Sequence, residues 1–523
     1  MSTTVTAFEG HRRIASGELS AVAVAAKAVV DRAGGGSVLI FDDRTSAQVE
    51  IDFRGSVEDL RARLTAATPL QEPARRGRPK LGVTAREVTL LPRQWEWLNT
   101  QPGGASATLR RLIDQARKQD AGAEVVRAAR DALYRFMHAI AGDVAGYEDA
   151  LRALFAGQSE GFIAATANWP ADVRDHAWRL APMAFGFQPS PLDAAIPFDR
   201  RAAVQRAVDA AFPGQEISAS APVVGGASGA RVFRLTLGDQ DRLLRLEGAR
   251  DALRDPARQY ACMKIAAAAG VAPRLIYADV QDGVAITDFI QVSPPDPSVS
   301  RESRLRAIGQ AIATLHAAPR FPGLVDVVDG VAAVIAQAEA LNAMPKAGTE
   351  RMRRLFAELA RIYPRDPADQ VSSHNDLNPT NLLFEGERVW IVDWESAFAA
   401  DRYMDLAAVA NFFAADETEE EQVLEAYFGA VLSDHHRAKL VVMQQLNRLF
   451  YAAMLLSAAV AAQPDLKLTP ADLDTPRYSL IRAEAASIAT TAGKARFACA
   501  FLNEADHACA SLRFAWAVER LNA

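Results

Sequence analysis

Hydrophobic positions in the first 66 residues form one helical stretch and several short apolar runs. Residues 21–33 are rich in Ala and Val and end at three successive glycines, which is typical of a helix and its end. Residues 37–41 and 47–53 are β-branched runs on either side of a polar turn, a pattern that predicts a hairpin. The sequence therefore predicts a small α+β domain at residues 1–66.

A helical pattern follows a linker rich in Pro and Arg at residues 69–79. Apolar residues then recur at the helical period in residues 92–99, 108–118 and 121–185. Breaks are expected at Gly103–Gly104, Trp169–Pro170 and Pro182, because Gly and Pro interrupt helices. A stretch with two prolines at residues 188–192 has the composition of a connector between domains.

Beyond residue 190, predicted strands come first and long helices follow. An amphipathic helix at residues 198–212 precedes a strand, a Gly-rich turn and a second strand within residues 222–235. The later predicted elements are a strand at 242–246, a helix at 255–270, a hairpin within 276–290, and helices at 301–315, 426–460 and 478–521.

Composition narrows the class of protein. The chain of 523 residues is long enough for about two to four domains. Its net charge of −6 gives no overall attraction to nucleic acid or to anionic membranes. Cys262, Cys499 and Cys509 lack metal-ligand spacing, and no apolar run is long enough to span a membrane. We therefore expect a cytoplasmic protein with reduced thiols and no membrane partner.

The clearest chemistry lies in a loop that is followed by a predicted hairpin. Asp376 and Asn381 precede two short apolar runs, 382–383 and 389–392, and Asp393 follows the second run. A hairpin returns its two ends to the same place, so these side chains can converge. Phosphoryl transfer to an alcohol requires a carboxylate that accepts the hydroxyl proton and oxygen ligands for Mg²⁺. Asp376 suits the first task, and Asn381 and Asp393 suit the second.

The alternative for an Asp and an Asn five residues apart is an ordinary Asx turn. The joint order of His374, Asp376, Asn381, a predicted hairpin and the sequence Asp-Trp-Glu favours a catalytic site. This order resembles the catalytic and metal-binding segments of the aminoglycoside phosphotransferase and choline kinase superfamily, the small-molecule relatives of protein kinases. The sequences His-Asn-Asp and Asp-Trp-Glu are similar to those of the choline kinase branch.

The resemblance covers residues 190–523 and implies an α+β, two-lobed protein-kinase-like fold. A small antiparallel N-lobe and a mostly helical C-lobe would meet at the prolines of residues 294–297. A separate α+β N-terminal domain would precede them. The resemblance also implies ATP and Mg²⁺ as cofactors, with Asp376 as the base and Asn381 and Asp393 as metal ligands.

Arg245 stands where protein kinases carry the lysine that pairs with phosphates, and a guanidinium can bind phosphate oxygens through two hydrogen bonds. The Gly-rich turn would direct backbone N–H groups at the phosphates. The strand end at residues 287–290 resembles the hinge that binds adenine. The expected nucleotide contacts are Gly225, Gly226, Ser228, Gly229, Arg245, Asp288 and Ile290.

Four further residues have supporting roles by resemblance. Gln259 falls at the position of the helix glutamate that pairs with the cation, but it brings no charge. Asp405 is expected to brace the catalytic loop, and His374 to orient it. Glu395 would assist a metal-bound water or face the acceptor. We expect His316 only to cap the end of its helix.

Residues 1–187 resemble a bacterial domain family without an assigned function. A basic sequence at residues 75–80, a predicted strand at 83–90 and the following helices, with Arg110 and Arg111, resemble an AT-hook core and a ribbon-helix-helix module. One hypothesis is therefore DNA binding through residues 75–118. The alternative is a basic linker before an ordinary helical hairpin.

The sequence thus predicts an ATP- and Mg²⁺-dependent phosphotransferase that acts on a hydroxyl of a small, cationic, choline- or ethanolamine-like metabolite. Alternatives are an aminoglycoside acceptor, or a DNA-binding protein whose kinase-like part senses a ligand. Tyr427, Phe514 and Trp516 are either cation–π surfaces for the acceptor or parts of the core. The predicted segments are 1–66, 67–120, 121–187, the N-lobe at 188–292 and the C-lobe at 293–523.

Overall fold

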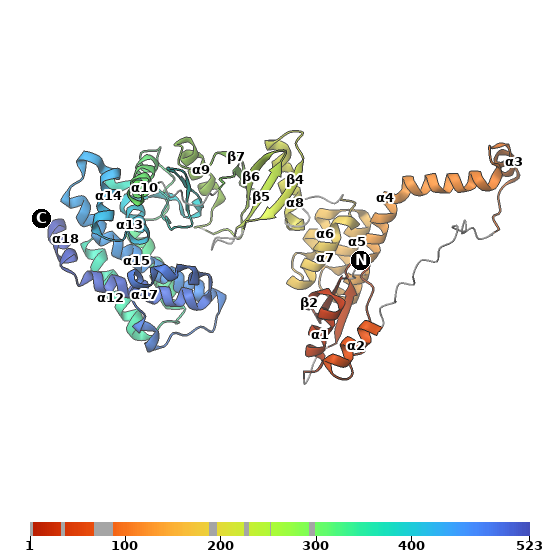
Figure 1. The fold of residues 1–523 in the computed structure, drawn as a ribbon, viewed down its shortest axis with the longest axis horizontal. Helices are drawn as coiled ribbons and strands as arrows, with labels where there is room; N and C mark the ends of the chain where they lie inside the picture. Colours follow the sequence, from red (N-terminus) through yellow and green to blue (C-terminus); the bar gives the residue numbers. More distant parts are fainter. Residues whose placement is uncertain are drawn as a thin grey trace. The chain divides into compact units, whose positions relative to one another are not determined.

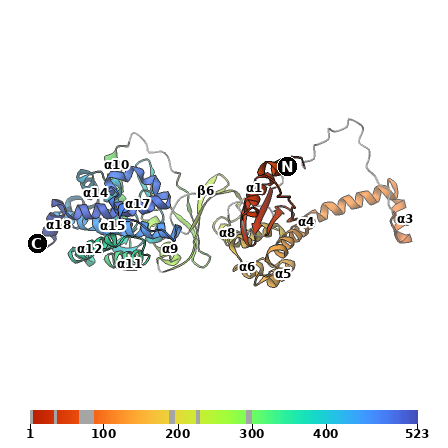
Figure 2. The same cartoon turned by 90° about the horizontal axis from the view of Figure 1, so that it is seen from below.

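The computed structural model describes residues 4–32, 37–66, 87–187, 196–223, 230–251, 253–291 and 299–522 (Figure 1 and Figure 2). Contacts between residues divide the chain into two units, residues 1–202 and 203–523. The boundary that the sequence analysis placed at residue 188 lies in a stretch outside the described residues.

The first unit contains a three-stranded antiparallel sheet in the order β2-β1-β3. Its strands are β1 (Thr4–Glu9), β2 (Arg12–Glu18) and β3 (Val38–Asp42), and α1 (Leu19–Val30) follows β2. Val5 and Ala7 of β1 pack with α1, whereas Phe8 packs into a second, helical core. Burial on both faces explains why β1 has almost no exposed position.

The predicted hairpin between residues 37–41 and 47–53 forms only next to its turn. The N–H of Asp42 donates to the carbonyl of Ala47 at 2.9 Å, the N–H of Val49 donates to the carbonyl of Ile40 at 2.8 Å, and Phe41 and Gln48 form an isolated antiparallel bridge. On its other edge, β3 pairs with β1. Beyond the bridge, Ile51 and Phe53 pack against the core beside α1, so burial accounts for the rest of the alternation.

Helices complete the first unit. They are α2 (Val57–Ala66), α3 (Pro92–Thr100), α4 (Gly104–Ala141), α5 (Tyr147–Ala156), α6 (Ser159–Thr166) and α7 (Ala171–Ala184). The two helices expected at 108–118 and from 121 are one helix of 38 residues, α4. Pro182 lies inside α7, in its last turn, and the helix ends two residues later at Ala184.

The hypothesis of a ribbon-helix-helix module stays a prediction. The basic residues 75–80 and most of the predicted strand lie outside the described residues, and residues 87–90 form no strand. Only α3 and the following helix correspond to the expected pattern.

The boundary between the units falls within α8 (Phe198–Ala211), and a five-stranded antiparallel sheet in the order β4-β5-β6-β8-β7 follows in the second unit. The strands are β4 (Ile217–Pro222), β5 (Arg231–Leu237), β6 (Gln240–Leu246), β7 (Leu275–Asp279) and β8 (Val284–Asp288). Between β6 and β7 lies α9 (Pro256–Ala268), which begins where Asp255 accepts a hydrogen bond from the N–H of Ala257. The Gly-rich turn at residues 225–229 lies outside the described residues.

A mostly helical part follows the sheet. It contains α10 (Arg301–His316), α11 (Val327–Ala340), α12 (Lys346–Ile362), α13 (Arg402–Phe413), α14 (Glu417–Phe428), α15 (Asp434–Ala462), α16 (Tyr478–Ile481), α17 (Thr491–Cys509) and α18 (Leu512–Asn522). Two strand pairs are inserted in it: β9 (Gln370–Ser373) with β12 (Phe398–Asp401), and β10 (Leu382–Glu385) with β11 (Arg388–Ile391). The predicted fold, a small antiparallel sheet before a helical lobe, with a separate α+β domain preceding both, is confirmed.

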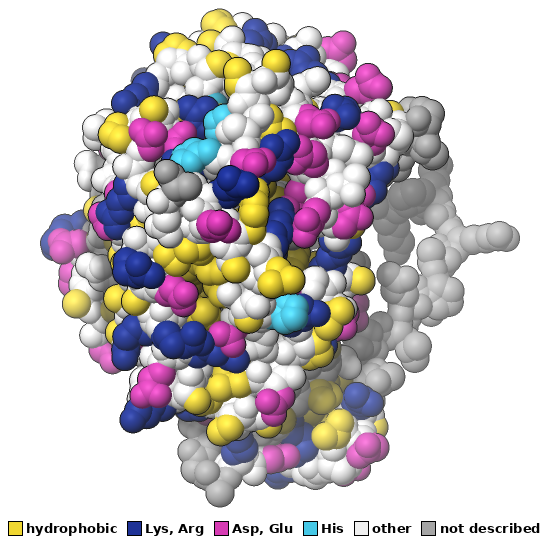
Figure 3. Space-filling model, turned by 90° about the vertical axis from the view of Figure 1, so that its left-hand side faces the viewer, with side chains coloured by type: hydrophobic (Ala, Val, Ile, Leu, Met, Phe, Trp, Pro, Cys, Tyr) yellow, Lys and Arg dark blue, Asp and Glu magenta, His cyan; other side chains and the backbone are white. Residues whose placement is uncertain are grey.

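The helix predicted at residues 426–460 is interrupted at Gly429, which has a φ of 56°. Gly tolerates this backbone better than other residues do, and so separates α14 from α15. The helix predicted at 478–521 is likewise divided by a 3-10 segment, Arg482–Ala489. Figure 3 presents one face of the molecule, on which acidic and basic side chains are interspersed. Among the described helices, none has the length and apolar composition that a membrane crossing requires.

Candidate active site

The hairpin of β10 and β11 places the loop that contains Asp376 beside the acidic segment that begins at Asp393. Leu382 pairs with Ile391, and the N–H of Val392 continues the ladder by donating to the carbonyl of Asn381, at 3.0 Å. Asp393 follows with a φ of 63°, a left-handed conformation that few residues other than Gly adopt. The hairpin thus brings Asn381 and the Asp393 segment together.

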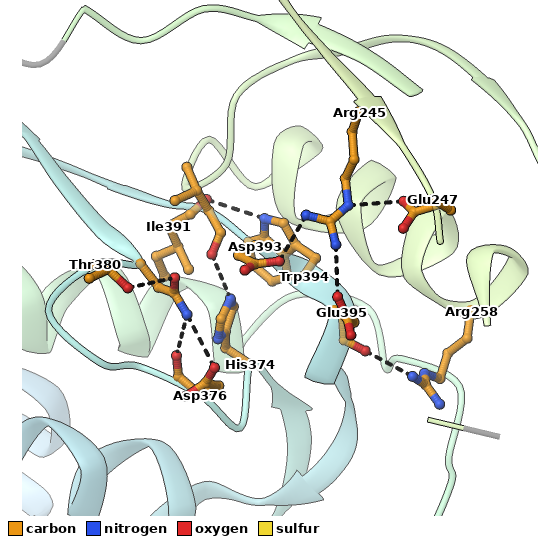
Figure 4. Close-up of polar contacts among 12 residues, drawn as sticks. Arg245, Glu247, Arg258, His374, Asp376, Thr380, Ile391, Asp393, Trp394 and Glu395 are labelled. Atoms are coloured by element: carbon orange, nitrogen blue, oxygen red, sulfur yellow. Dashed lines mark hydrogen bonds and ion pairs between the residues drawn. The ribbon is translucent and has the colours of Figure 1, made fainter. Parts of the chain in front are cut away.

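Asp376 lies in the loop before the hairpin (Figure 4). Its side chain is held by neutral donors. The hydroxyl of Tyr451 donates to Asp376 Oδ1 at 2.7 Å, and Asn378 Nδ2 donates to the same oxygen at 3.1 Å. Asn381 Nδ2 donates to the Asp376 carbonyl at 2.8 Å and to Oδ2 at 3.3 Å. Burial raises the pKa of Asp376, and the hydrogen bond from Tyr451 offsets part of this rise. The carboxylate is therefore a stronger base than an exposed aspartate.

Asp405, at the start of α13, holds the backbone of the same loop. Its two oxygens accept hydrogen bonds from the N–H of His374 at 2.8 Å and of Asn375 at 2.7 Å. His316 Nε2 lies 3.0 Å from Asp405 Oδ2, and His316 Nδ1 contacts the hydroxyl of Tyr427 at 2.8 Å. Burial alone would raise the pKa of Asp405, but the hydrogen bond from His316 and the neighbouring donors lower it below its usual value.

His374 links this loop to the hairpin. Its Nε2 lies 3.0 Å from the carbonyl oxygen of Val392, which can only accept, so Nε2 carries the proton. The ring also packs edge-on against Trp394, with centroids 4.8 Å apart. His374 thus orients the loop through its backbone and its ring.

Arg245 of β6 lies among three carboxylates (Figure 4). Its Nε donates to Glu247 Oε1 at 3.0 Å, one terminal nitrogen donates to Asp393 Oδ1 at 3.0 Å, and the other donates to Glu395 Oε2 at 2.9 Å. Burial disfavours the charged guanidinium, but the three carboxylates outweigh it and raise the pKa of Arg245. Burial also raises the pKa of Glu395, and Arg245 offsets part of that rise.

Gln259, at the position where the sequence left the partner of Arg245 in doubt, makes no hydrogen bond to Arg245 in the described part of the chain. Gln259 is 2% exposed, and its Nε2 has no hydrogen-bond partner among the described residues. Glu247, the first residue after β6, pairs with Arg245 instead. α9 contacts the acidic segment instead through Arg258, which donates to the carbonyl of Glu395 at 2.9 Å. Alternate residues of an extended chain share a face. The position of Glu247, two residues after Arg245, was therefore a signal in the sequence.

A pocket adjoins Arg245 and Gln259. It contains about 470 Å³ of empty space, open solvent included. Its lining residues are Leu243, Arg245, Gln259, Met263, Ala272, Pro273, Ala285, Thr287, Val392, Asp393 and Trp394. The recess is mostly apolar and includes a cation, an amide N–H without a partner among the described residues, and a carboxylate.

The remaining predicted nucleotide contacts are only partly described. Asp288 ends β8, and Arg274 holds its carboxylate through Nε at 3.2 Å. Ile290 is half-buried, two residues beyond this strand. Gly225, Gly226, Ser228 and Gly229 lie outside the described residues.

The oxygens of Asn381 and Asp393 fit a magnesium ion that is shared with phosphates. In the described part of the chain, no group of three His, Cys, Asp or Glu side chains has a metal-binding arrangement. Mg²⁺ commonly takes one or two protein oxygens and completes its octahedron with water and phosphate oxygens. The fit therefore requires the nucleotide as a co-ligand.

Two family models match the chain. Residues 4–181 match "Uncharacterized protein conserved in bacteria (DUF2239)", and residues 220–441 match "Phosphotransferase enzyme family". No curated protein sequence matches the chain.

Solved structures with a similar fold include kinases of small molecules. A choline/ethanolamine kinase family protein from Mesorhizobium loti is 20% identical, with 62% of this chain and 99% of that chain covered and a TM-score of 0.43. Choline kinase LicA from Streptococcus pneumoniae is 18% identical, with 56% and 98% covered and a TM-score of 0.41. A spectinomycin phosphotransferase is 12% identical, with 62% and 97% covered and a TM-score of 0.38. The two family models thus match separate stretches of the chain, residues 4–181 and 220–441.

Proposed function

We propose that the protein transfers the γ-phosphoryl group of Mg²⁺-ATP to a hydroxyl group of a small molecule. The observation that carries this proposal is the convergence of Asp376, Asn381 and Asp393 at the hairpin, with Arg245 bound to Asp393. A base, two hard oxygen ligands and a phosphate-binding cation are the parts that phosphoryl transfer requires.

Asp376 is the proposed base. As the acceptor oxygen bonds to phosphorus and the bond between phosphorus and the ADP oxygen breaks, the hydroxyl proton passes to Asp376. Burial of this carboxylate raises its pKa, and a base with a higher pKa takes a proton more readily. The hydroxyl of Tyr451, at 2.7 Å, indicates where an acceptor hydroxyl can approach.

Asn381 and Asp393 are the proposed ligands of Mg²⁺, which would neutralise charge on the phosphates. Arg245 would bind phosphate oxygens, and Glu247 and Glu395 hold its guanidinium in place. Asp405 and His374 position the loop without touching the reacting atoms.

A choline- or ethanolamine-like acceptor, and an aminoglycoside as its rival, remain hypotheses from resemblance. The aromatic residues named for a cation have other roles: Phe514 is buried, and Trp516 packs against the core. The hydroxyl of Tyr427 contacts His316 and Arg402. These contacts favour the alternative that the three residues are parts of the core. A cytoplasmic location also remains a prediction, which the three free cysteines suit.

The test is ADP release by the purified chain with Mg²⁺-ATP and a panel of alcohols. We expect one class of alcohol to stimulate release, and Asp376→Ala to abolish the stimulation while ATP binding, measured by calorimetry, persists. Full activity in Asp376→Ala would refute the mechanism. ATP binding without stimulation by any alcohol would favour the sensor hypothesis. DNA binding through residues 75–118 is a separate hypothesis, for which a salt-dependent mobility shift of A·T-rich DNA is the test.

A further inference from the structure

The acidic segment that begins at Asp393 is strained at its first residue. Asp393 has a φ of 63°, a left-handed conformation that is unfavourable for residues other than Gly and persists where surrounding contacts hold it. The chain before it is held by the hairpin, because the N–H of Val392 donates to the carbonyl of Asn381 at 3.0 Å. After it comes a short 3-10 turn, Trp394–Ser396. The conformation of the segment therefore depends also on what holds this turn.

Arg258 holds the turn from the start of α9 (Figure 4). The residue lies in the first turn of that helix and is only 6% exposed. One terminal nitrogen of its guanidinium donates to the carbonyl of Glu395 at 2.9 Å and also to the carbonyl of Leu253, in the loop before the helix. The guanidinium carbon lies 6.0 Å from the ring centroid of Phe398, the first residue of β12. Arg258 thus joins the start of α9 to the backbone of the acidic segment.

A second residue of α9 makes a similar contact one turn later. The thiol of Cys262, which is fully buried, donates to the carbonyl of Ala397 at 3.5 Å. Arg258 and Cys262 are four residues apart, so they share a face of the helix. The two carbonyls that accept from them, those of Glu395 and Ala397, are two residues apart. One face of α9 therefore lies along the backbone of the acidic segment.

The contact of Arg258 differs in kind from that of Arg245. Arg245 pairs with the carboxylates of Asp393 and Glu395, whereas Arg258 donates to a backbone carbonyl. Arg258 is not among the residues that line the recess beside Arg245, although its neighbour Gln259 is. Arg258 can therefore fix the backbone of the acidic segment without contacting a ligand in the recess.

We propose that Arg258 is a positioning residue, which holds the acidic segment so that Asp393 can serve as a ligand of Mg²⁺. The inference rests on the proposed function and adds a residue that acts on the metal site through the backbone. In this arrangement α9 fixes the metal ligand and not the phosphate-binding Arg245, to which Gln259 makes no hydrogen bond in the part of the chain that the structure describes.

Amide hydrogen exchange in the full chain tests whether Arg258 holds the segment. In Arg258→Gln we expect the amides of residues 394–398 to exchange about tenfold faster, because a hydrogen bond from a charged donor is lost. The amides of the hairpin, residues 382–391, should exchange as they do in the unaltered chain. Arg258→Lys keeps the charge but loses the planar fork of donors, so its exchange rate should be intermediate.

Binding of ADP, measured by calorimetry with Mg²⁺ and with a chelator, tests the link to the metal. The Kd with the chelator divided by the Kd with Mg²⁺ reports how much the metal contributes to binding. In Arg258→Gln this ratio should fall by about tenfold, toward the ratio of Asp393→Asn, which removes the proposed ligand. The Kd with the chelator should not change, whereas a general loss of structure would weaken binding in both conditions.

Arg254→Gln is the matched control. Arg254 lies four residues before Arg258 and pairs with Asp251 at 2.7 Å. Its charge acts on Glu395, but among the described residues it makes no hydrogen bond to the acidic segment. The substitution therefore removes an equal charge near the segment and leaves the backbone contacts in place. Exchange and the contribution of Mg²⁺ should both stay as in the unaltered chain.

Three results would overturn the inference and leave the proposed phosphoryl transfer standing. They are unchanged exchange in Arg258→Gln, an equal effect of Arg254→Gln, and faster exchange without any change in the contribution of Mg²⁺. If Arg258→Gln does not fold, the lysine variant decides by the same two measurements. If ADP binds the unaltered chain equally well with and without Mg²⁺, the inference fails together with the metal part of the proposed function.

Discussion

Asp376, which is partly buried, and Asp405, which is fully buried, serve the same loop, yet their pKa values move in opposite directions. Burial raises the pKa of Asp376, and the hydrogen bonds that it accepts offset this only in part. Asp405 is as strongly desolvated, but His316 and two backbone N–H groups lower its pKa below the usual value. Burial is common to both, so the donors around each carboxylate decide the outcome.

The two aspartates also differ in how fully their carboxylate oxygens are hydrogen-bonded. Both oxygens of Asp405 accept short hydrogen bonds from the loop that they support. At Asp376 the short bond is to Oδ1, and Oδ2 accepts only a longer one of 3.3 Å, from Asn381. An aspartate with saturated oxygens is fixed as a structural anion, whereas one with an undersatisfied oxygen can take a proton. We therefore expect Asp405 to support the loop and Asp376 to take part in the reaction.

Asp376→Asn should have the largest effect, and on activity alone. Loss of a general base commonly costs about 10²- to 10⁴-fold in rate, so kcat should fall by that order. The pKa of Asp376 is higher in the folded state than in the unfolded state. Ionisation of this side chain therefore lowers the stability of the fold as pH rises through that pKa. The melting temperature at pH 7 should therefore stay equal or rise, and a clear fall would contradict the comparison.

Asp405→Asn should instead destabilise the fold. Breaking a buried, hydrogen-bonded charge site costs about 3–5 kcal/mol, so urea unfolding at pH 7 should shift to lower concentration. Because the folded pKa is lowered, this stabilisation is present above the unfolded pKa, near 3.8, and is lost as pH falls through the folded value. The variant should lose that acid dependence.

Asp401→Asn is the matched control at the same helix start. Asp401 accepts from the N–H of Tyr403 at 2.9 Å, but burial raises its pKa to about 6. Its ionised form therefore costs stability above pH 6, and the asparagine, which can still cap the helix, should increase stability at pH 7. Equal destabilisation by both substitutions would show that position, and not charge, matters.

The sequence predicted the parts of this site that are local. The loop and hairpin around Asp376, Asn381 and Asp393 follow from short apolar runs and a turn, whose pairing depends on near neighbours. The strand order of the small sheet likewise agrees with predicted hairpins. Glu247 was missed although it lies only two residues after Arg245, directly beyond the end of β6.

Other parts depend on contacts that a single sequence does not display. Tyr451 reaches Asp376 across 75 positions, and His316 reaches Asp405 across 89. Each looked like an ordinary helical residue, because its function comes from how helices pack. The hairpin predicted from residues 47–53 is shorter in the structure for the same reason, since burial and not strand pairing accounts for the alternation beyond the bridge between Phe41 and Gln48.

Arg245→Gln tests the part of the site in which carboxylates surround an arginine, whereas the donors to Asp376 are neutral. Loss of a charged partner for phosphate should weaken ATP binding by about tenfold, or about 1.4 kcal/mol, as measured by calorimetry. Arg245 also lowers the pKa of Glu395, so that pKa should rise in the variant. Unchanged ATP affinity would exclude Arg245 as a phosphate ligand.

Tyr451→Phe should have the smallest effect and acts on Asp376 alone. The hydroxyl of Tyr451 lowers the pKa of Asp376, so its removal should raise that pKa further. Asp376 must be ionised to accept a proton, and activity is lost as pH falls through its pKa. The acid limb of kcat/KM against pH should therefore move to higher pH, while the plateau changes little.

Tyr403→Phe is the control for this shift, because the buried hydroxyl of Tyr403 has no hydrogen-bond partner among the described residues. Its removal should leave the acid limb in place. If both variants moved the limb equally, packing of the helical lobe would govern the base. If neither variant moved the acid limb, the contact at Asp376 Oδ1 would not control the ionisation of Asp376. The contrast with Asp405 would then rest on the N–H groups of the loop alone.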